Sequence, residues 1–87
     1  MAERDIVMVE WTDSNGQSRW NDRTATKKNL SLARCRSFGE VVKDVDDYIM
    51  VAGSVDDSND NVDHVYCIPR SAIQKVTVLK KAKLKAE

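Results

Sequence analysis

Residues 32–54 read LARCRSFGEVVKDVDDYIMVAGS, and this stretch decides the fold because it predicts two β-strands joined by an acidic turn at residues 44–47. In the first arm, Arg34, Arg36 and Phe38 alternate with smaller residues, which is the period-two pattern of a strand. The second arm, YIMVAG, is apolar on both faces and rich in residues that strands favour. We therefore expect a long hairpin whose second arm has little exposure.

Gly39 interrupts the pattern of the first arm. A glycine inside a strand usually marks a bulge, a sharp bend or a close backbone approach, since it lacks a Cβ atom. We expect the first strand of the hairpin to bend at Phe38 and Gly39, so that residues 40–43 run in a new direction. A strand bent in this way can serve two sides of a small barrel.

Further strands are predicted on either side of the hairpin. In residues 5–11, DIVMVEW, Val7, Val9 and Trp11 share one face. Pro69 ends a later strand, and a short 3₁₀ turn is expected after it. The five expected strands are residues 5–11, 32–43, 47–54, 64–68 and 73–79. Their order predicts an all-β fold, a small five-stranded SH3-like and partly open barrel, with a ring-forming Sm-like variant as the alternative.

The chain has 87 residues, which is enough for a single domain. We expect an ordered core over residues 5–79 and a charged tail over residues 80–87. No apolar run predicts a transmembrane segment, and the start has no signal-peptide pattern, so we expect a cytoplasmic protein. In that reducing compartment Cys35 and Cys67 are expected to be small buried hydrophobes rather than a disulfide.

The formal net charge is zero, but the charges are segregated along the chain. Residues 19–36 carry six basic side chains and one acidic one, whereas residues 40–63 carry eight acidic side chains and one basic one. Such blocks either fold back to neutralise one another or form opposed patches for partners.

The connection after the first strand is the main candidate for a binding surface, because a loop of this length is unusual in a compact domain. Asn15-Gly16 predicts either a short hairpin or a turn into a loop, and one helical turn is expected near residues 24–28. The binding residues we expect are Arg19, Trp20, Arg23, Lys27, Lys28, Arg34 and Arg36. The alternatives are a solvated basic face paired with the acidic loop, and Trp20 as a lid over an open barrel end.

The acidic segment at residues 57–63, DSNDNVD, begins like a calcium-binding loop. The pattern then fails, because Val62 stands where the EF-hand requires glycine and Ile68 where it requires glutamate. A polar turn is the better interpretation. His64, Cys35 and Cys67 lack the spacing of a zinc site, so we expect no metal, no cofactor and no enzymatic activity.

Three short motifs, VEW at residues 9–11, RSFG at residues 36–39 and CIPRSAI at residues 67–73, resemble small proteins of unknown function found in bacteriophage and prophage genomes. The resemblance covers residues 7–79. It implies a phage setting in a bacterial host cell, and it supplies neither a catalytic residue nor a ligand.

The leading hypothesis is a non-enzymatic interaction module that recognises a protein partner, either of the host or of the phage, through the Trp20 loop. Edge strands on so small a barrel also allow a homodimer or small oligomer. One alternative is a nucleic-acid binder that uses residues 19–36. The other is an oligomer that holds an anionic small molecule with Arg34 and Arg36.

Overall fold

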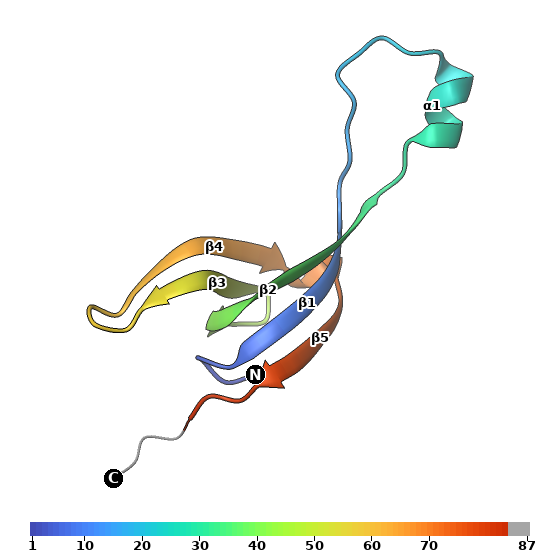
Figure 1. The fold of residues 1–87 in the computed structure, drawn as a ribbon. Helices are drawn as coiled ribbons and strands as arrows, with labels where there is room; N and C mark the ends of the chain where they lie inside the picture. The colour runs from blue at the N-terminus through green and yellow to red at the C-terminus, as the bar shows by residue number, and fades with distance from the viewer. Residues whose placement is uncertain (84–87) are drawn as a thin grey trace.

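Residues 1–83 are described by a computed structural model, and the predicted charged tail lies partly outside them. Five antiparallel strands form one open sheet in the order β4-β3-β2-β1-β5 (Figure 1). The strands are β1 (Ile6–Asp13), β2 (Ala33–Asp44), β3 (Tyr48–Asp56), β4 (Asn61–Pro69) and β5 (Ile73–Lys80). Two short helices complete the fold, α1 (Arg23–Asn29) and the 3₁₀ turn η1 (Arg70–Ala72). The all-β prediction and the 3₁₀ turn before the last strand are confirmed.

The strand β2 serves two neighbours, as expected for the organising hairpin. It pairs with β1 as far as Glu40 and with β3 from Glu40 onward. The pairing becomes irregular between Val41 and Lys43, so the bulge falls after the glycine. At Gly39 itself a Cβ atom would lie 2.4 Å from the carbonyl oxygen of Ala52. The glycine is therefore required by a close backbone approach, one of the three expected reasons.

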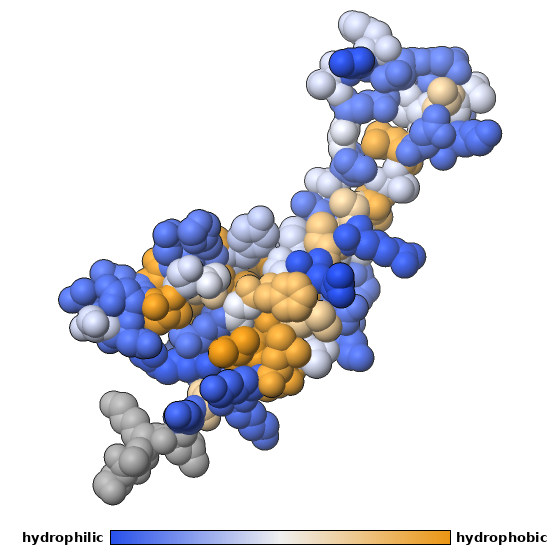
Figure 2. All heavy atoms as spheres, in the orientation of Figure 1, coloured by the Kyte–Doolittle hydropathy of each residue, from blue (hydrophilic) through white to orange (hydrophobic). Residues whose placement is uncertain are grey.

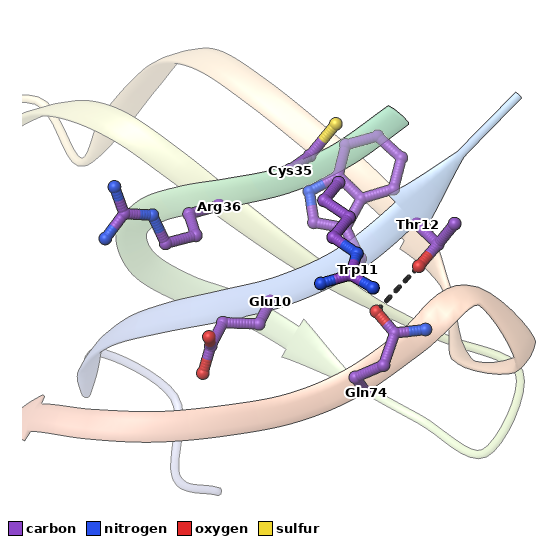
Figure 3. Close-up of a pocket in the computed structure, with 7 residues that line it drawn as sticks. Glu10, Trp11, Thr12, Cys35, Arg36 and Gln74 are labelled. Atoms are coloured by element: carbon purple, nitrogen blue, oxygen red, sulfur yellow. Dashed lines mark hydrogen bonds between the residues drawn. The ribbon is translucent and has the colours of Figure 1, made fainter. Parts of the chain in front are cut away.

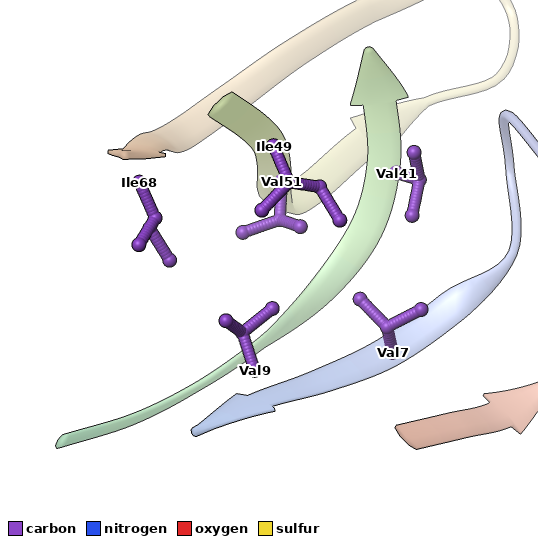
Figure 4. Packing of buried hydrophobic residues seen from close by; sticks show 6 residues of the cluster. All are labelled: Val7, Val9, Val41, Ile49, Val51 and Ile68. Carbon is purple, nitrogen blue, oxygen red and sulfur yellow. The ribbon is translucent and has the colours of Figure 1, made fainter. Parts of the chain in front are cut away.

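The core lies on one face of the sheet and consists of β-branched side chains from four strands (Figure 4). Its members are Val7, Val9, Val41, Ile49, Val51 and Ile68. Val7 and Val9 are completely buried whereas Ile6 is exposed, which confirms the predicted faces of β1. Trp11, Ile73 and Val76 pack against this core and are themselves partly buried.

The sheet curls, because strands that are not neighbours in it touch across the inner face. The rings of Trp11 on β1 and Tyr66 on β4 meet edge to face with 6.5 Å between their centroids. The strands β2 and β3 lie between them in the sheet. Trp11 also donates a hydrogen bond from Nε1 to Ser37 Oγ at 3.0 Å. Trp11, which shares the face of Val7 and Val9, is thus half-buried rather than enclosed in the core.

The hairpin of β3 and β4 corrects the prediction of a polar loop over residues 55–63. Both strands run further than expected, and only residues 57–60 form the turn. The Asp56 carboxylate accepts hydrogen bonds from the amide of Ser58 and from Asn59 Nδ2, which fixes the turn. Ile68 is the one buried residue of β4. A strand exposed on both faces has no apolar alternation, which explains why its first half was missed.

Two polar clusters tie the ends of the strands together. The buried Asp5 accepts hydrogen bonds from the amides of Ala2 and Ala82, which links β1 to the end of β5. The Asp44 carboxylate pairs with the amino group of Met1 at 3.1 Å and with the guanidinium of Arg70. Arg70 also donates to the carbonyl of Val45 at 2.9 Å, so η1 is clamped to the acidic turn.

Candidate functional site

Residues 14–32, which we call the arm, connect β1 to β2 and extend away from the sheet (Figure 1). The molecule measures 64 × 24 × 20 Å, and its radius of gyration is 17.0 Å. A compact domain of this length would have a radius of about 12 Å. The long predicted connection is therefore a projecting element with little contact to the body.

The arm has its own local structure. Asp22 caps α1 by accepting a hydrogen bond from the amide of Ala25 at 3.1 Å. Gln17 Nε2 donates to Thr26 Oγ1 at 3.0 Å and joins the two limbs of the arm. The helical turn expected near residues 24–28 is confirmed. Asn15-Gly16 forms no tight hairpin, because neither residue takes a positive φ and the turn leads into a loop.

Trp20 is the most exposed large side chain on the arm, with a relative exposure of 103%. The alternative that it closes a barrel end is therefore wrong. Asn21 beside it uses its side-chain amide locally, donating to the carbonyl of Arg19 at 3.1 Å. Trp20 is therefore an isolated indole on the arm, whereas Trp11 and Tyr66 form a pair on the sheet.

The basic side chains of the arm are not neutralised by carboxylates of residues 1–83. Within residues 1–83, no carboxylate forms an ion pair with Arg19, Arg23, Lys27 or Lys28. The one acid of the arm is Asp22, which is used as the helix cap. Hydrophilic atoms cover most of the arm surface (Figure 2). The interpretation that the basic segment pairs with the acidic loop is wrong, since the arm and the β3–β4 turn lie at opposite ends (Figure 1).

Arg34 and Arg36 lie apart from the tip of the arm, on the outer face of β2. They stand opposite Thr12 and Glu10 on β1. Together with Gln74 of β5 these side chains surround an open hollow of about 590 Å³ (Figure 3). Thr12 Oγ1 donates a hydrogen bond to Gln74 Oε1 at 2.8 Å, and this bond fixes the side chains on one side of the hollow. The two arginines thus form a second basic surface, separate from the other five predicted residues.

A smaller hollow of about 200 Å³, which we call the acidic hollow, lies beside the β3–β4 turn. Val42 and Val62 supply apolar surface there. Its charged lining residues are Glu3, Arg4, Glu40 and Asp60. Arg4 pairs with Asp60 at 3.0 Å, and this hydrogen bond, with the charges of Asp60, Glu40 and Asp57, raises the pKa of Arg4. The three carboxylates against one guanidinium give the lining of the hollow an excess of negative charge.

Sequence reasoning did not find the acidic hollow. Glu3, Glu40 and Asp60 lie in three separate segments. The pairing of β2, β3 and β4 and the backbone hydrogen bond from Arg4 to Val41 bring them together. The exposed apolar side chain of Val62 was a signal, because it stands among polar residues.

The cysteine prediction is corrected in one respect. Both thiols are free, but Cys35 is half-buried and Cys67 is exposed, so neither is a core hydrophobe. On β4 only the inward-facing Ile68 is buried, and Cys67 points to the opposite face. Within residues 1–83 no three His, Cys, Asp or Glu side chains are arranged to hold a metal ion.

None of the helices in the described part of the chain has the length and apolar character required to cross a bilayer. Comparison with protein families, with curated proteins and with solved structures finds no match to this chain. The geometry of the arm and of the sheet that carries it is therefore the basis for inferring function.

Proposed function

We propose that this protein is a non-enzymatic interaction module that recognises a protein partner through the arm. The sheet, which we propose to be an SH3-like, partly open barrel, acts as a rigid base. Supporting this assignment, β1 pairs with both β2 and β5, β2 bridges to β3, and a 3₁₀ turn precedes β5.

The observation that carries the proposal is the full exposure of Trp20 on a projecting arm. An indole buries a large area at low entropic cost, and tryptophan is enriched among residues that dominate protein interfaces. An isolated exposed hydrophobic residue is ordinary on a protein surface. Here, however, the residue stands on an element that adds nothing to the core.

The chemistry of the partner follows from the charge of the arm. Four cations and one capping carboxylate leave a net positive surface around the indole. A complementary partner presents an apolar slot with an acidic rim, because opposite potentials speed encounter and fix register. On the resemblance to phage proteins, we propose that this partner is a bacterial or phage protein in the cytoplasm.

The test is photo-cross-linking from the arm in a bacterial lysate. A photoreactive phenylalanine analogue at position 20 is expected to capture a defined protein, whereas the same analogue at position 79 is not. Leu79 is the matched control because it is an exposed apolar residue on β5, away from the arm. Trp20→Ala is expected to weaken binding of the captured protein by at least ~30-fold. Equal capture from both positions would contradict the proposal.

Nucleic-acid binding is the second candidate, and the unpaired cations beside an exposed indole favour it. Such a surface holds phosphates by charge and stacks a base on the aromatic ring. It predicts a gel shift at ~50 mM salt that disappears steeply as salt rises. A domain of zero net charge lacks the basic excess typical of such proteins, so a protein partner remains our first proposal.

A further inference from the structure

We propose that the acidic hollow of a second copy of this chain is a docking site for the arm, so that molecules associate head to tail. This inference rests on the proposed function, because it names a partner for the same surface. It also names the site that receives the arm, the number of arms that each copy can bind, and the head-to-tail way in which the copies assemble.

The size of the acidic hollow fits a single side chain. Its volume of about 200 Å³ lies below the ~300–1,000 Å³ typical of small-molecule sites. Val62 has a relative exposure of 43% and offers apolar surface that nothing in residues 1–83 covers. An indole entering there would bury that surface together with its own.

The charges around the two surfaces are complementary. The hollow is lined by Glu3, Glu40 and Asp60 against one cation, Arg4, which is engaged by Asp60. Arg19 precedes Trp20 in the sequence and Arg23 follows on α1, and neither forms an ion pair in residues 1–83. When the indole enters the hollow, these guanidinium groups meet the carboxylates of Glu3 and Glu40, which form no ion pair within residues 1–83.

Geometry requires the two surfaces to come from different molecules. The whole molecule, arm included, is 64 Å long, and the arm and the β3–β4 turn lie at opposite ends of it (Figure 1). Asp60 and Val62, at and beside that turn, line the hollow. Each copy therefore carries one arm and one hollow. Such a heterologous contact propagates into chains or closes into rings, whereas a two-fold symmetric contact stops at a dimer.

The wild-type test is sedimentation equilibrium, at concentrations on the order of 10 μM to 1 mM, because an interface this small is weak. The average mass is expected to rise with protein concentration at low salt, and to fall towards the monomer at ~1 M salt, where charges are screened. A monomeric mass at every concentration and at low salt would overturn the inference.

Two variants make the test specific. The arm variant is Arg19→Glu with Trp20→Ala, and the hollow variant is Glu40→Lys with Val62→Lys. Each is expected to be monomeric alone, whereas an equimolar mixture forms a 1:1 dimer and nothing larger, because only one arm and one hollow remain intact. Formation of that dimer also shows that both variants are folded. A mixture that stays monomeric, or either variant associating alone as the wild type does, overturns the inference.

The result of the self-association test can be distinguished from the result of the cross-linking test of the proposed function. If the wild type is monomeric but position 20 still cross-links to another protein, self-association fails and the arm remains a binding surface. If the hollow variant abolishes association but keeps that cross-link, the hollow serves self-association and the arm has a second partner. If position 20 captures neither another copy nor another protein, both proposals fail.

Discussion

Gly39 lies at the point where β2 leaves β1 for β3, and its missing side chain lets two backbones approach. A Cβ atom there would lie 2.4 Å from the Ala52 carbonyl oxygen, so Gly39→Ala must push β2 and β3 apart. We expect the free energy of unfolding in urea to fall by about 1–3 kcal/mol. Gly16→Ala is the control, since nothing lies within 4 Å of its new Cβ atom, and the change should stay within ~0.5 kcal/mol. Equal effects of the two substitutions would contradict the explanation.

Asp44 should make stability depend on pH. Burial of the carboxyl raises its pKa, but hydrogen bonds from the Met1 amino group and Arg70 outweigh burial, and the pKa of Asp44 is lowered. Its stabilising contribution is therefore complete above about pH 4 and is lost as pH falls through the folded-state pKa. Asp44→Asn is expected to cost about 1–2 kcal/mol at neutral pH.

The measurement is urea denaturation of wild type and Asp44→Asn at neutral pH and at about pH 3. The difference between the two proteins should shrink at the lower pH. Asp46→Asn removes the same charge from the same turn at an exposed position, so it controls for net charge. An undiminished difference at low pH would refute the assignment.

At the residue scale, the sequence predicted inward and outward positions well and polar partners poorly. The alternation of Val7 and Val9 with Ile6 is a local signal, and the structure follows it. The carboxylate of Asp5 bonds an amide at position 82, and no local pattern announces a contact between residues so far apart in sequence. Trp20 stayed ambiguous because an indole is found both in cores and at surfaces.

Among the elements, α1 should behave as an independent local unit. It has seven residues, which is too short to be stable without its cap. Asp22→Ala is expected to cost about 1 kcal/mol of helix stability and to remove hydrogen-exchange protection from the amides of Thr26 and Leu30. The urea midpoint of the whole domain should not move, because the helix lies outside the core. A lowered midpoint would show that the arm supports the sheet.

Removal of the arm tests the same independence more strongly. Asp13 and Ala33 are the last paired residues of β1 and β2. Replacing residues 14–32 with a two-residue Asn-Gly turn should therefore leave a regular hairpin, because this turn matches strand twist. We expect the shortened chain to keep its β-rich circular dichroism and cooperative unfolding, and to lose cross-linking and self-association. An unfolded product would contradict this view of the arm.

Strand prediction succeeded where one face of the strand is buried. It succeeded for β1, β2 and β3, whose ends shifted by one or two residues from the expected ones. It failed over the first half of β4, where residues such as Asn61 and Asp63 are exposed and hold the strand only through the backbone ladder with β3. A pattern of side chains predicts a strand only where one face is buried. It cannot reveal a strand that is held by backbone hydrogen bonds alone.

For the whole molecule, the extended shape is itself a prediction. Small-angle scattering in high salt, where self-association is screened, should give a radius of gyration near the 17.0 Å of the structure. The chain without its arm, which has about 70 residues, should approach the compact value of about 11 Å. A compact value for the complete chain would mean that the arm folds back onto the sheet.

The succession of five strands along the chain and the segregation of charge were both predictable from the sequence. What the charge blocks do was not, because neutralisation depends on distance rather than on composition. The arm and the β3–β4 turn lie at opposite ends of the molecule, and within residues 1–83 one ion pair, Arg4 with Asp60, reaches the β3–β4 turn. The net charge of zero is therefore a sum over a molecule whose arm is basic and whose opposite end, at the β3–β4 turn, is acidic.

The outer edge of β4 carries a safeguard against fibril formation. A bare strand edge is a template on which other chains can add to build cross-β aggregates. Along β4, His64 takes a φ of 52°, in the left-handed region, and Asp63 beside it is charged and exposed. The kinked and charged ribbon offers no continuous ladder to an incoming strand. Copies of this chain can therefore meet at their ends at high concentration without adding strands along the β4 edge.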